Sequence, residues 1–204
     1  MSDAEQRLAD VQAGLDRACR DASRTETPLL VAISKTFHFG ENRVQEAAAK
    51  WPEMLAETPG ITLHLVGQLQ SNKAAEAVAL FDVIHSVDRP SLVTALAKAQ
   101  AAAGKHPACY LQVNIGNEAQ KGGCALADLP ALLAQARDAG LNVIGLMCVP
   151  PAAVEPAPYF ALLAEHAKRL GLTGLSMGMS SDYETAALLG STVVRVGSAL
   201  FGNR

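Results

Sequence analysis

The sequence predicts an α/β protein whose eight parallel strands close into a (β/α)8 barrel, with an extra helix at the N-terminus. Short apolar runs recur along the chain, and most are followed by an Ala/Leu-rich stretch with helical character. Runs such as LLVAI and VIGLMCV are apolar throughout, as strands covered by helices must be. No composition break marks a second domain, and no Gly-rich phosphate fingerprint follows the first strand, which favours a closed barrel over a doubly wound sheet.

Composition excludes several classes of protein. The chain has 204 residues, with 17 Lys+Arg against 20 Asp+Glu and a formal charge of -3, which is typical of one globular domain. It has no basic run for a polyphosphate backbone and no apolar stretch of about 20 residues, so we expect neither nucleic acid nor a membrane as a partner. The four cysteines form no CxxC pair, and the polar N-terminus does not resemble a secretory signal. Reduced thiols and a cytoplasmic location are expected.

The elements follow from apolar spacing. Residues 1–24 form the extra helix, with Leu8, Val11 and Leu15 on one apolar face, and residues 29–202 form the barrel of the same single domain. The eight strands are predicted to begin near Leu29, Phe39, Thr62, Val83, Cys109, Asn142, Gly174 and Val193.

The first two of these strands are too close together in the sequence. Only Thr36, Phe37 and His38 lie between Lys35 and Phe39, whereas a crossover between parallel strands needs about a dozen residues. Either these strands are not parallel neighbours, or a crossover segment is absent.

Lys35 is a candidate nucleophile. It ends the run LLVAISK, which places an amine at the carboxyl end of a buried strand, the active face of a barrel. Desolvation there lowers the pKa of a lysine and lets the neutral amine form a Schiff base. The alternative is a strand-end lysine whose amine reaches water.

The segment HLVGQLQSNK, residues 64–73, gathers polar side chains at a junction between a strand and a helix. Ser71 or Asn72 could cap that helix. His64 could serve the site, or it could be an ordinary hydrogen-bonded core histidine.

Two further junctions are typical of a phosphate site. Ser180 follows the seventh strand, and Gly197 and Ser198 follow the eighth, where barrels commonly hold phosphate on backbone N–H groups. Ser181 and Glu184 have the spacing of a helix capping box. The alternative is two ordinary strand ends.

Arg195 alternates with Val194 and Val196 in the last strand, so it should face the barrel interior and must find a partner there. That partner is either a ligand or a carboxylate from a neighbouring strand.

Taken together, these segments resemble the pyridoxal-phosphate homeostasis proteins. The resemblance spans residues 29–202, nearly the whole chain, and rests on the blocks AISKT, FGENRVQEA, HLVGQLQSNK, QVNI, EAQKGG, GLMCVPP, YFALL, LSMGMSSDYE and VRVGSALFG, which occur in this order. It implies a TIM barrel of the fold type III of pyridoxal-phosphate (PLP) proteins, related to the N-terminal domain of alanine racemase.

The resemblance also implies site residues. Lys35 would hold pyridoxal 5'-phosphate as a Schiff base, Ser180, Gly197 and Ser198 would bind its phosphate, and Arg195 would face its pyridine nitrogen. The residues expected to line the ring are Asn42, His64, Asn114 and Met147. Family members carry a helix between the SKT and FGEN blocks, so roughly a dozen or more residues of the natural chain are expected to be omitted from this sequence. A true deletion instead would put barrel closure and the placement of Lys35 in question.

The resemblance predicts a protein that stores, buffers or delivers pyridoxal phosphate to PLP-dependent apo-enzymes as a monomer, without catalytic turnover. Racemases of this fold add a second domain and a tyrosine base, whereas the tyrosines here are Tyr110, Tyr159 and Tyr183, and none lies in an added domain. The alternatives are a small racemase-like or lyase-like enzyme acting on amino acids, and a barrel that binds a phosphate sugar without the cofactor.

Overall fold

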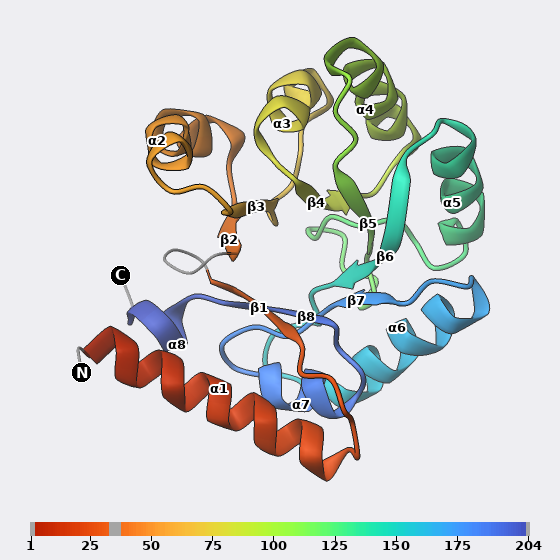
Figure 1. The fold of residues 1–204 in the computed structure, drawn as a ribbon. Helices are drawn as coiled ribbons and strands as arrows, with labels where there is room; N and C mark the ends of the chain where they lie inside the picture. The colour runs from red at the N-terminus through yellow and green to blue at the C-terminus, as the bar shows by residue number, and fades with distance from the viewer. Residues whose placement is uncertain (1–2, 33–37, 203–204) are drawn as a thin grey trace.

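The structure is a computed structural model that describes residues 3–32 and 38–202 (Figure 1). Its elements are, in chain order, α1 (Asp3–Asp21), β1 (Leu29–Ala32), β2 (His38–Glu41), α2 (Val44–Glu57), β3 (Thr62–Leu65), η1 (Ser71–Lys73), α3 (Ala74–Leu80), β4 (Val83–Val87), α4 (Pro90–Ala103), β5 (Ala108–Val113), α5 (Leu129–Asp138), β6 (Asn142–Cys148), α6 (Ala157–Arg169), β7 (Gly174–Ser176), α7 (Tyr183–Leu188), β8 (Val193–Val196) and α8 (Ser198–Phe201).

The eight strands form a closed barrel in the order of the sequence. Each strand pairs in parallel with its neighbours, and β1 completes the ring by pairing with β8. The helices that follow the strands surround the ring from outside, as Figure 1 shows. The predicted fold class is therefore confirmed. Six strands begin at the predicted residue, while β2 and β5 each begin one residue earlier.

β1 and β2 are parallel neighbours although only residues 33–37 separate them. Their register contains one pair, Ala32 with Phe39, whereas β1 and β8 share four pairs. The interpretation that these strands are not neighbours was wrong, whereas the absence of a crossover segment stays a prediction. The barrel closes here because β1 is held mainly by β8.

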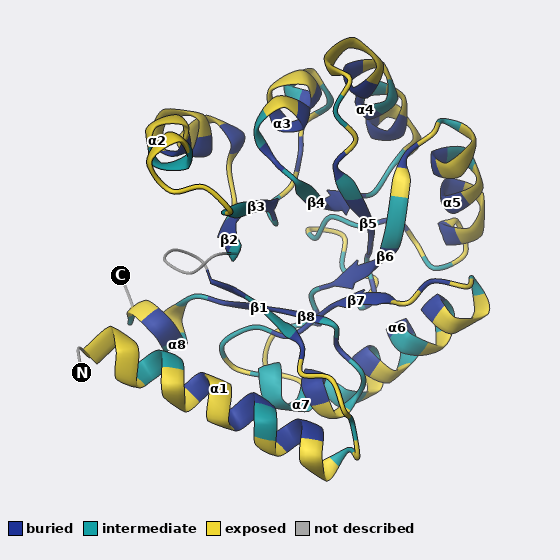
Figure 2. Cartoon of the chain, in the orientation of Figure 1, coloured by how far each residue is buried: buried dark blue, intermediate teal, exposed yellow. Residues whose placement is uncertain are grey.

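The strands present different side chains to the inside and the outside of the barrel. In β8, Val194 and Val196 pack outward against the N-terminal helix, while Val193 packs in the interior with Tyr110 and Met147. Most strand residues are buried, as the largely dark strands in Figure 2 show, although β6 begins with exposed and half-buried residues. This burial explains why the strand sequences are apolar throughout rather than alternating.

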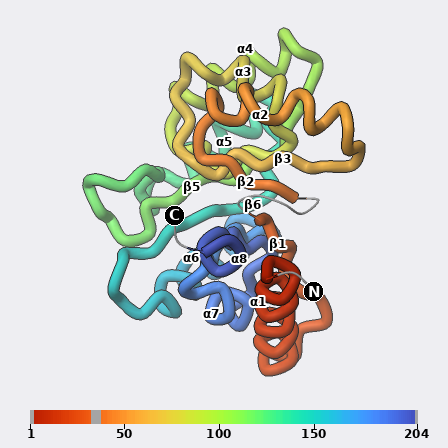
Figure 3. Tube along the Cα trace, turned by 90° about the vertical axis from the view of Figure 1, so that its left-hand side faces the viewer, coloured from red at the N-terminus to blue at the C-terminus, as the bar shows by residue number. Residues whose placement is uncertain are grey.

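α1 covers the part of the barrel formed by the two ends of the sequence. Its buried stripe of Val11, Leu15, Ala18 and Cys19 packs with Val194 and other residues in one apolar cluster. It contacts α7 and α8, so the start of the chain lies beside its end (Figures 1 and 3). Among the described helices, none has the length and hydropathy needed to cross a bilayer.

Candidate functional site

A cavity of about 410 Å³ opens where β2, β3, β6, β7 and β8 end. Its volume lies within the range of small-molecule sites. It brings together five residues that the sequence predicts for one site, Asn42, Ser180, Arg195, Gly197 and Ser198. The remaining lining residues are Val66, Val149, Met179 and Ser181. Every lining residue lies in β8 or in a segment that follows the end of β2, β3, β6, β7 or β8, so the barrel itself positions the site.

Ser180 joins the loops after β7 and β8. Its Oγ accepts hydrogen bonds from the backbone N–H of Gly197 at 3.1 Å and of Ala199 at 3.2 Å. A hydroxyl has two acceptor positions and one proton. Because both acceptor positions are taken, the Ser180 hydroxyl can offer an occupant of the cavity only its proton, which suits an anionic oxygen.

The loop that carries Ser180 depends on Gly178. This glycine has φ of +96°, and a Cβ at this position would lie 2.6 Å from the Cβ of Ala186. Its carbonyl accepts the backbone N–H of Arg195 at 2.9 Å, which ties this loop to β8. A residue with a side chain would be both strained and crowded here.

The expected capping box of Ser181 and Glu184 is wrong. The residue before α7 is Asp182, whose Oδ1 accepts the backbone N–H of Met179 at 2.6 Å, and α7 has no side-chain cap. Glu184 instead contacts Arg17 and Tyr183. Asp182 occupies the N-cap position that was expected for Ser181. Its carboxylate binds the N–H of Met179 in the preceding loop and does not cap an N–H of α7. Ser181 is consequently free to line the cavity.

Arg195 faces the interior, as predicted. Only 5% of its surface is exposed, and its Nη1 donates to Ser176 Oγ at 2.6 Å while its Nη2 donates to the Cys148 carbonyl at 3.0 Å. Burial lowers the pKa of this guanidinium, an effect that Cys148 and Asp182 oppose. Within the described residues no carboxylate forms a salt bridge with it, so the expected alternative of a structural ion pair is not observed.

The charges of the cavity therefore suit an anion. Among the described residues that line the cavity, Arg195 is the one charged group, and the lining also contains three serines, while Val66 and Val149 supply apolar surface. A buried cation without a carboxylate is costly unless a ligand supplies the missing acceptor. The arrangement fits a small, partly apolar molecule with a phosphate or similar anionic group and a further acceptor atom for the guanidinium.

The structure does not bring every predicted residue into this lining. Lys35 lies outside the described residues. His64 is buried inside the barrel, and Met147 packs in the interior beside Val31 and Tyr110. Asn114 shapes its own loop, since its side chain bonds the backbone of Glu118 and Lys121. The roles expected for these four residues stay predictions.

Two polar residues of the barrel interior that connect to Arg195 were not predicted from the sequence. Ser176 contacts the guanidinium, and His85 contacts Ser176. His85 lies within the short strand run VIHSV, between Ile84 and Ser86, and His64 lies between two leucines in TLHLV. Histidines in two consecutive strands were the available signal, because alternate residues of neighbouring strands face the same interior.

Comparisons with known proteins show similarity along nearly the whole chain. Residues 29–204 match the family "Alanine racemase, N-terminal domain". The chain is 39% identical to the pyridoxal phosphate homeostasis protein of Pseudomonas aeruginosa, with 100% of this chain and 97% of that protein covered. It is 40% identical to the protein of the same name from Deinococcus radiodurans, with 94% and 97% covered.

A solved structure shows the same similarity in three dimensions. PipY of Synechococcus elongatus, with PLP bound, superposes with a TM-score of 0.82 and 38% identity, covering 98% of this chain and 100% of that chain. The alignment with the Pseudomonas protein extends over 226 positions and includes all 204 residues here, so that relative has at least 22 residues without a counterpart. That number is large enough for the missing crossover helix.

Proposed function

Since the chain belongs to the family of pyridoxal phosphate homeostasis proteins, whose barrel is that of the alanine racemase N-terminal domain, we propose that it binds pyridoxal 5'-phosphate in this cavity. Its role is to store, buffer or deliver the cofactor. The observation that carries the proposal is the pairing of the Ser180 bridge with Arg195, a buried cation without a carboxylate partner among the described residues.

The residues divide between the two ends of the ligand. Ser180, Gly197 and Ser198 hold the phosphate: the two serines offer their hydroxyl protons to the anion, and Gly197, whose own N–H is taken by Ser180 Oγ, leaves room for it because it has no side chain. Arg195 donates to the ring nitrogen, and Asn42 borders the ring. Lys35 supplies the amine that links covalently to the cofactor aldehyde, with loss of water.

Bound pyridoxal phosphate supplies an aldehyde for amine capture and a ring that can withdraw electrons. Arg195 limits the second of these, because a guanidinium does not give up its proton and so leaves the ring nitrogen unprotonated. Arg195 thus favours binding of the cofactor without catalysis by it.

The lining of the cavity supports a protein without turnover. Its described residues include no carboxylate, histidine, cysteine or tyrosine that could exchange a proton with a substrate. Tyr110 is enclosed in the barrel against His85, and Tyr183 contacts Glu184 on α7. A racemase needs an acid or base on each side of its substrate, and Lys35 alone would provide one.

We extend the proposal to the setting in which the protein works. Its four cysteines are free and buried, and burial raises the pKa of Cys109, Cys124 and Cys148 to about 12. Thiols with such pKa values are poor nucleophiles, which fits a structural role. These features fit a reducing cytoplasm. We propose that the protein works there as a monomer and that its partners are apo-enzymes that require the cofactor.

An absorption titration with pyridoxal phosphate tests this proposal. We expect the protein to acquire the band of a lysine-bound cofactor, to transfer the cofactor to an apo-enzyme, and to form no product from amino acids. Steady racemisation or decarboxylation that depends on Lys35 would favour the enzyme instead. Absence of any bound cofactor would favour the phosphate-sugar binder.

A further inference from the structure

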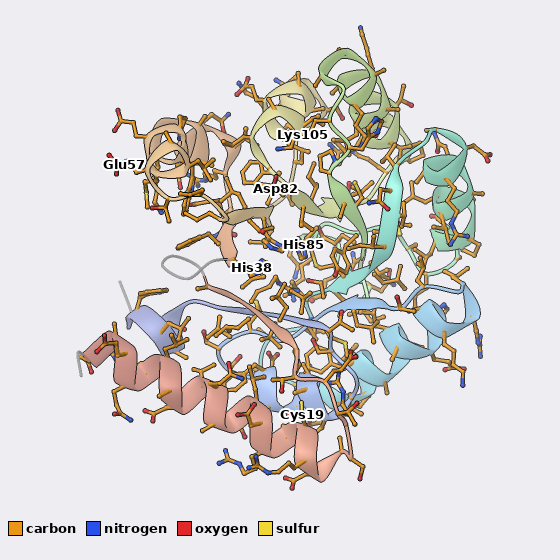
Figure 4. All side chains as sticks on the ribbon, viewed as in Figure 1. Cys19, His38, Glu57, Asp82, His85 and Lys105 are labelled. Atoms are coloured by element: carbon orange, nitrogen blue, oxygen red, sulfur yellow. The ribbon has the colours of Figure 1, made fainter. Side chains whose placement is uncertain are left out.

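An unbroken line of hydrogen bonds crosses the barrel interior and ends at Arg195. From the arginine, Nη1 contacts Ser176 Oγ at 2.6 Å, and Ser176 Oγ contacts His85 Nδ1 at 2.8 Å. His85 Nε2 lies 2.9 Å from His64 Nδ1, and His64 Nε2 lies 3.2 Å from His38 Nδ1. The residues come from β8, β7, β4, β3 and β2. Figure 4 shows His38 and His85 within the ring of strands.

The chemistry of arginine gives this line a direction. A guanidinium only donates, so Ser176 Oγ must accept from Arg195. Within the described part of the chain, the Ser176 hydroxyl has one other hydrogen-bond contact, His85 Nδ1, which is therefore the acceptor of its proton. His85 must then carry its proton on Nε2 and donate to His64 Nδ1. By the same step His64 carries its proton on Nε2 and donates to His38.

The surroundings keep the imidazoles neutral, as this direction requires. Ser176 and His85 are fully buried and His64 is 2% exposed, so a charge on either histidine would be desolvated. Burial lowers the pKa of His85, and the positive field of Arg195 and the neighbouring His64 lower it further. Burial and His38 lower the pKa of His64 to about 4, although Asp82 acts in the opposite direction.

We propose that Ser176, His85 and His64 are positioning residues, which hold the Arg195 guanidinium against the cavity by a one-way series of hydrogen bonds. The identity of the ligand that Arg195 faces rests on the proposed function, whereas the positions of the protons on Ser176, His85 and His64 do not. A carboxylate in place of Ser176 would fix the arginine equally well, yet it would neutralise the charge that a ligand acceptor needs. Neutral partners orient the guanidinium and leave that charge available.

The chain offers a matched pair of variants. Ser176→Ala removes the hydroxyl that joins Arg195 to His85. Ser86→Ala is the control, because Ser86 is also a buried serine of the barrel, 1% exposed, but its Oγ has no hydrogen-bond partner among residues 3–32 and 38–202. The affinity for pyridoxal phosphate should fall about tenfold to a hundredfold in Ser176→Ala and stay unchanged in Ser86→Ala.

Nitrogen-15 NMR of the imidazoles supplies a readout that needs no cofactor. In the wild-type protein, His64 and His85 should each be neutral with the proton on Nε2, and Ser176→Ala should release His85 from that single form. Mixed tautomers or a proton on Nδ1 in the wild-type protein would overturn the proposal, as would equal affinities in the two serine variants. If the wild-type protein binds no cofactor, the proposed function fails, and the tautomers still decide whether the ordered line exists.

Discussion

Ser180 Oγ accepts the backbone N–H of Gly197 at 3.1 Å, which joins the loop after β7 to the loop after β8. The contact spans 17 residues of sequence and closes one wall of the cavity. Arg195 lies two residues before Gly197, so the same wall carries both the hydroxyl and the cation. The phosphate end and the ring end of the proposed ligand are thus fixed by one pair of neighbouring strands.

Ser180→Ala should weaken cofactor binding. The change removes the hydroxyl proton offered to the phosphate and frees two backbone amides that Ser180 now orients. Because hydrogen bonds to charged groups contribute about 1.5–3 kcal/mol, the dissociation constant should rise about tenfold to a hundredfold. Fluorescence or absorption titration measures this. The exposed Ser91→Ala is the control, and an equal dissociation constant for both variants would contradict the assignment.

Arg195→Met should separate binding from stability. It removes a buried cation that has no carboxylate partner among the described residues, and such a charge costs free energy in the unliganded protein. We expect the dissociation constant for the cofactor to rise at least about tenfold, while the free energy of unfolding changes by less than about 1 kcal/mol. Urea unfolding of the apo-protein gives the second quantity. A large loss of stability would show that the arginine is chiefly structural.

Gly67→Ala should disturb the cavity by displacing Asn42, which lines it. A Cβ on Gly67 would lie 2.1 Å from the Asn42 carbonyl oxygen, so the backbone of one of them must move. Overpacking of this kind costs about 1–3 kcal/mol. Both thermal stability and cofactor affinity should fall, which unfolding and titration measurements would show. Unchanged affinity would mean that the position of Asn42 is unimportant for binding.

The apo-protein should lose stability as the pH falls from 6.5 to about 4. The unfolded chain protonates His64 near its ordinary pKa of 6.5, whereas the folded state keeps that pKa at about 4 through burial and the nearby His38, with Asp82 opposing. The unfolded state therefore binds more protons in this window, and the free energy of unfolding falls by up to roughly 3 kcal/mol for His64 alone. Burial, His64 and Arg195 also lower the pKa of His85, which adds in the same direction.

Urea unfolding across that pH range measures the effect. His64→Gln should flatten the dependence, while the exposed His106→Gln should leave it as in the wild-type protein. Parallel curves for the His64 variant and the wild-type protein would show that His64 already carries its proton in the folded state.

Local patterns were enough to predict most of the barrel and one side of the site. Continuous apolar runs indicated strands covered on both sides, and the alternation around Arg195 indicated its inward direction. Ser180, Gly197 and Ser198 could be predicted because strand ends in a barrel share one face. The line from Arg195 through Ser176 to His85 could not, because it depends on the register of strands distant in sequence. The capping box of Ser181 was predicted wrongly for a similar reason. Asp182 precedes α7 instead, and its contact with Met179 in the loop could not be seen in the local sequence pattern.

Covalent capture by Lys35 is the central claim of this account, and borohydride reduction of the protein with pyridoxal phosphate tests it most directly. Reduction fixes a lysine–cofactor link as a stable amine, which peptide mass spectrometry can locate. We predict that the wild-type protein carries the label on the peptide that contains Lys35, and that Lys35→Ala carries none there while the exposed Lys98→Ala is labelled normally. Labelling that spares Lys35, or that persists equally in Lys35→Ala, would contradict the account.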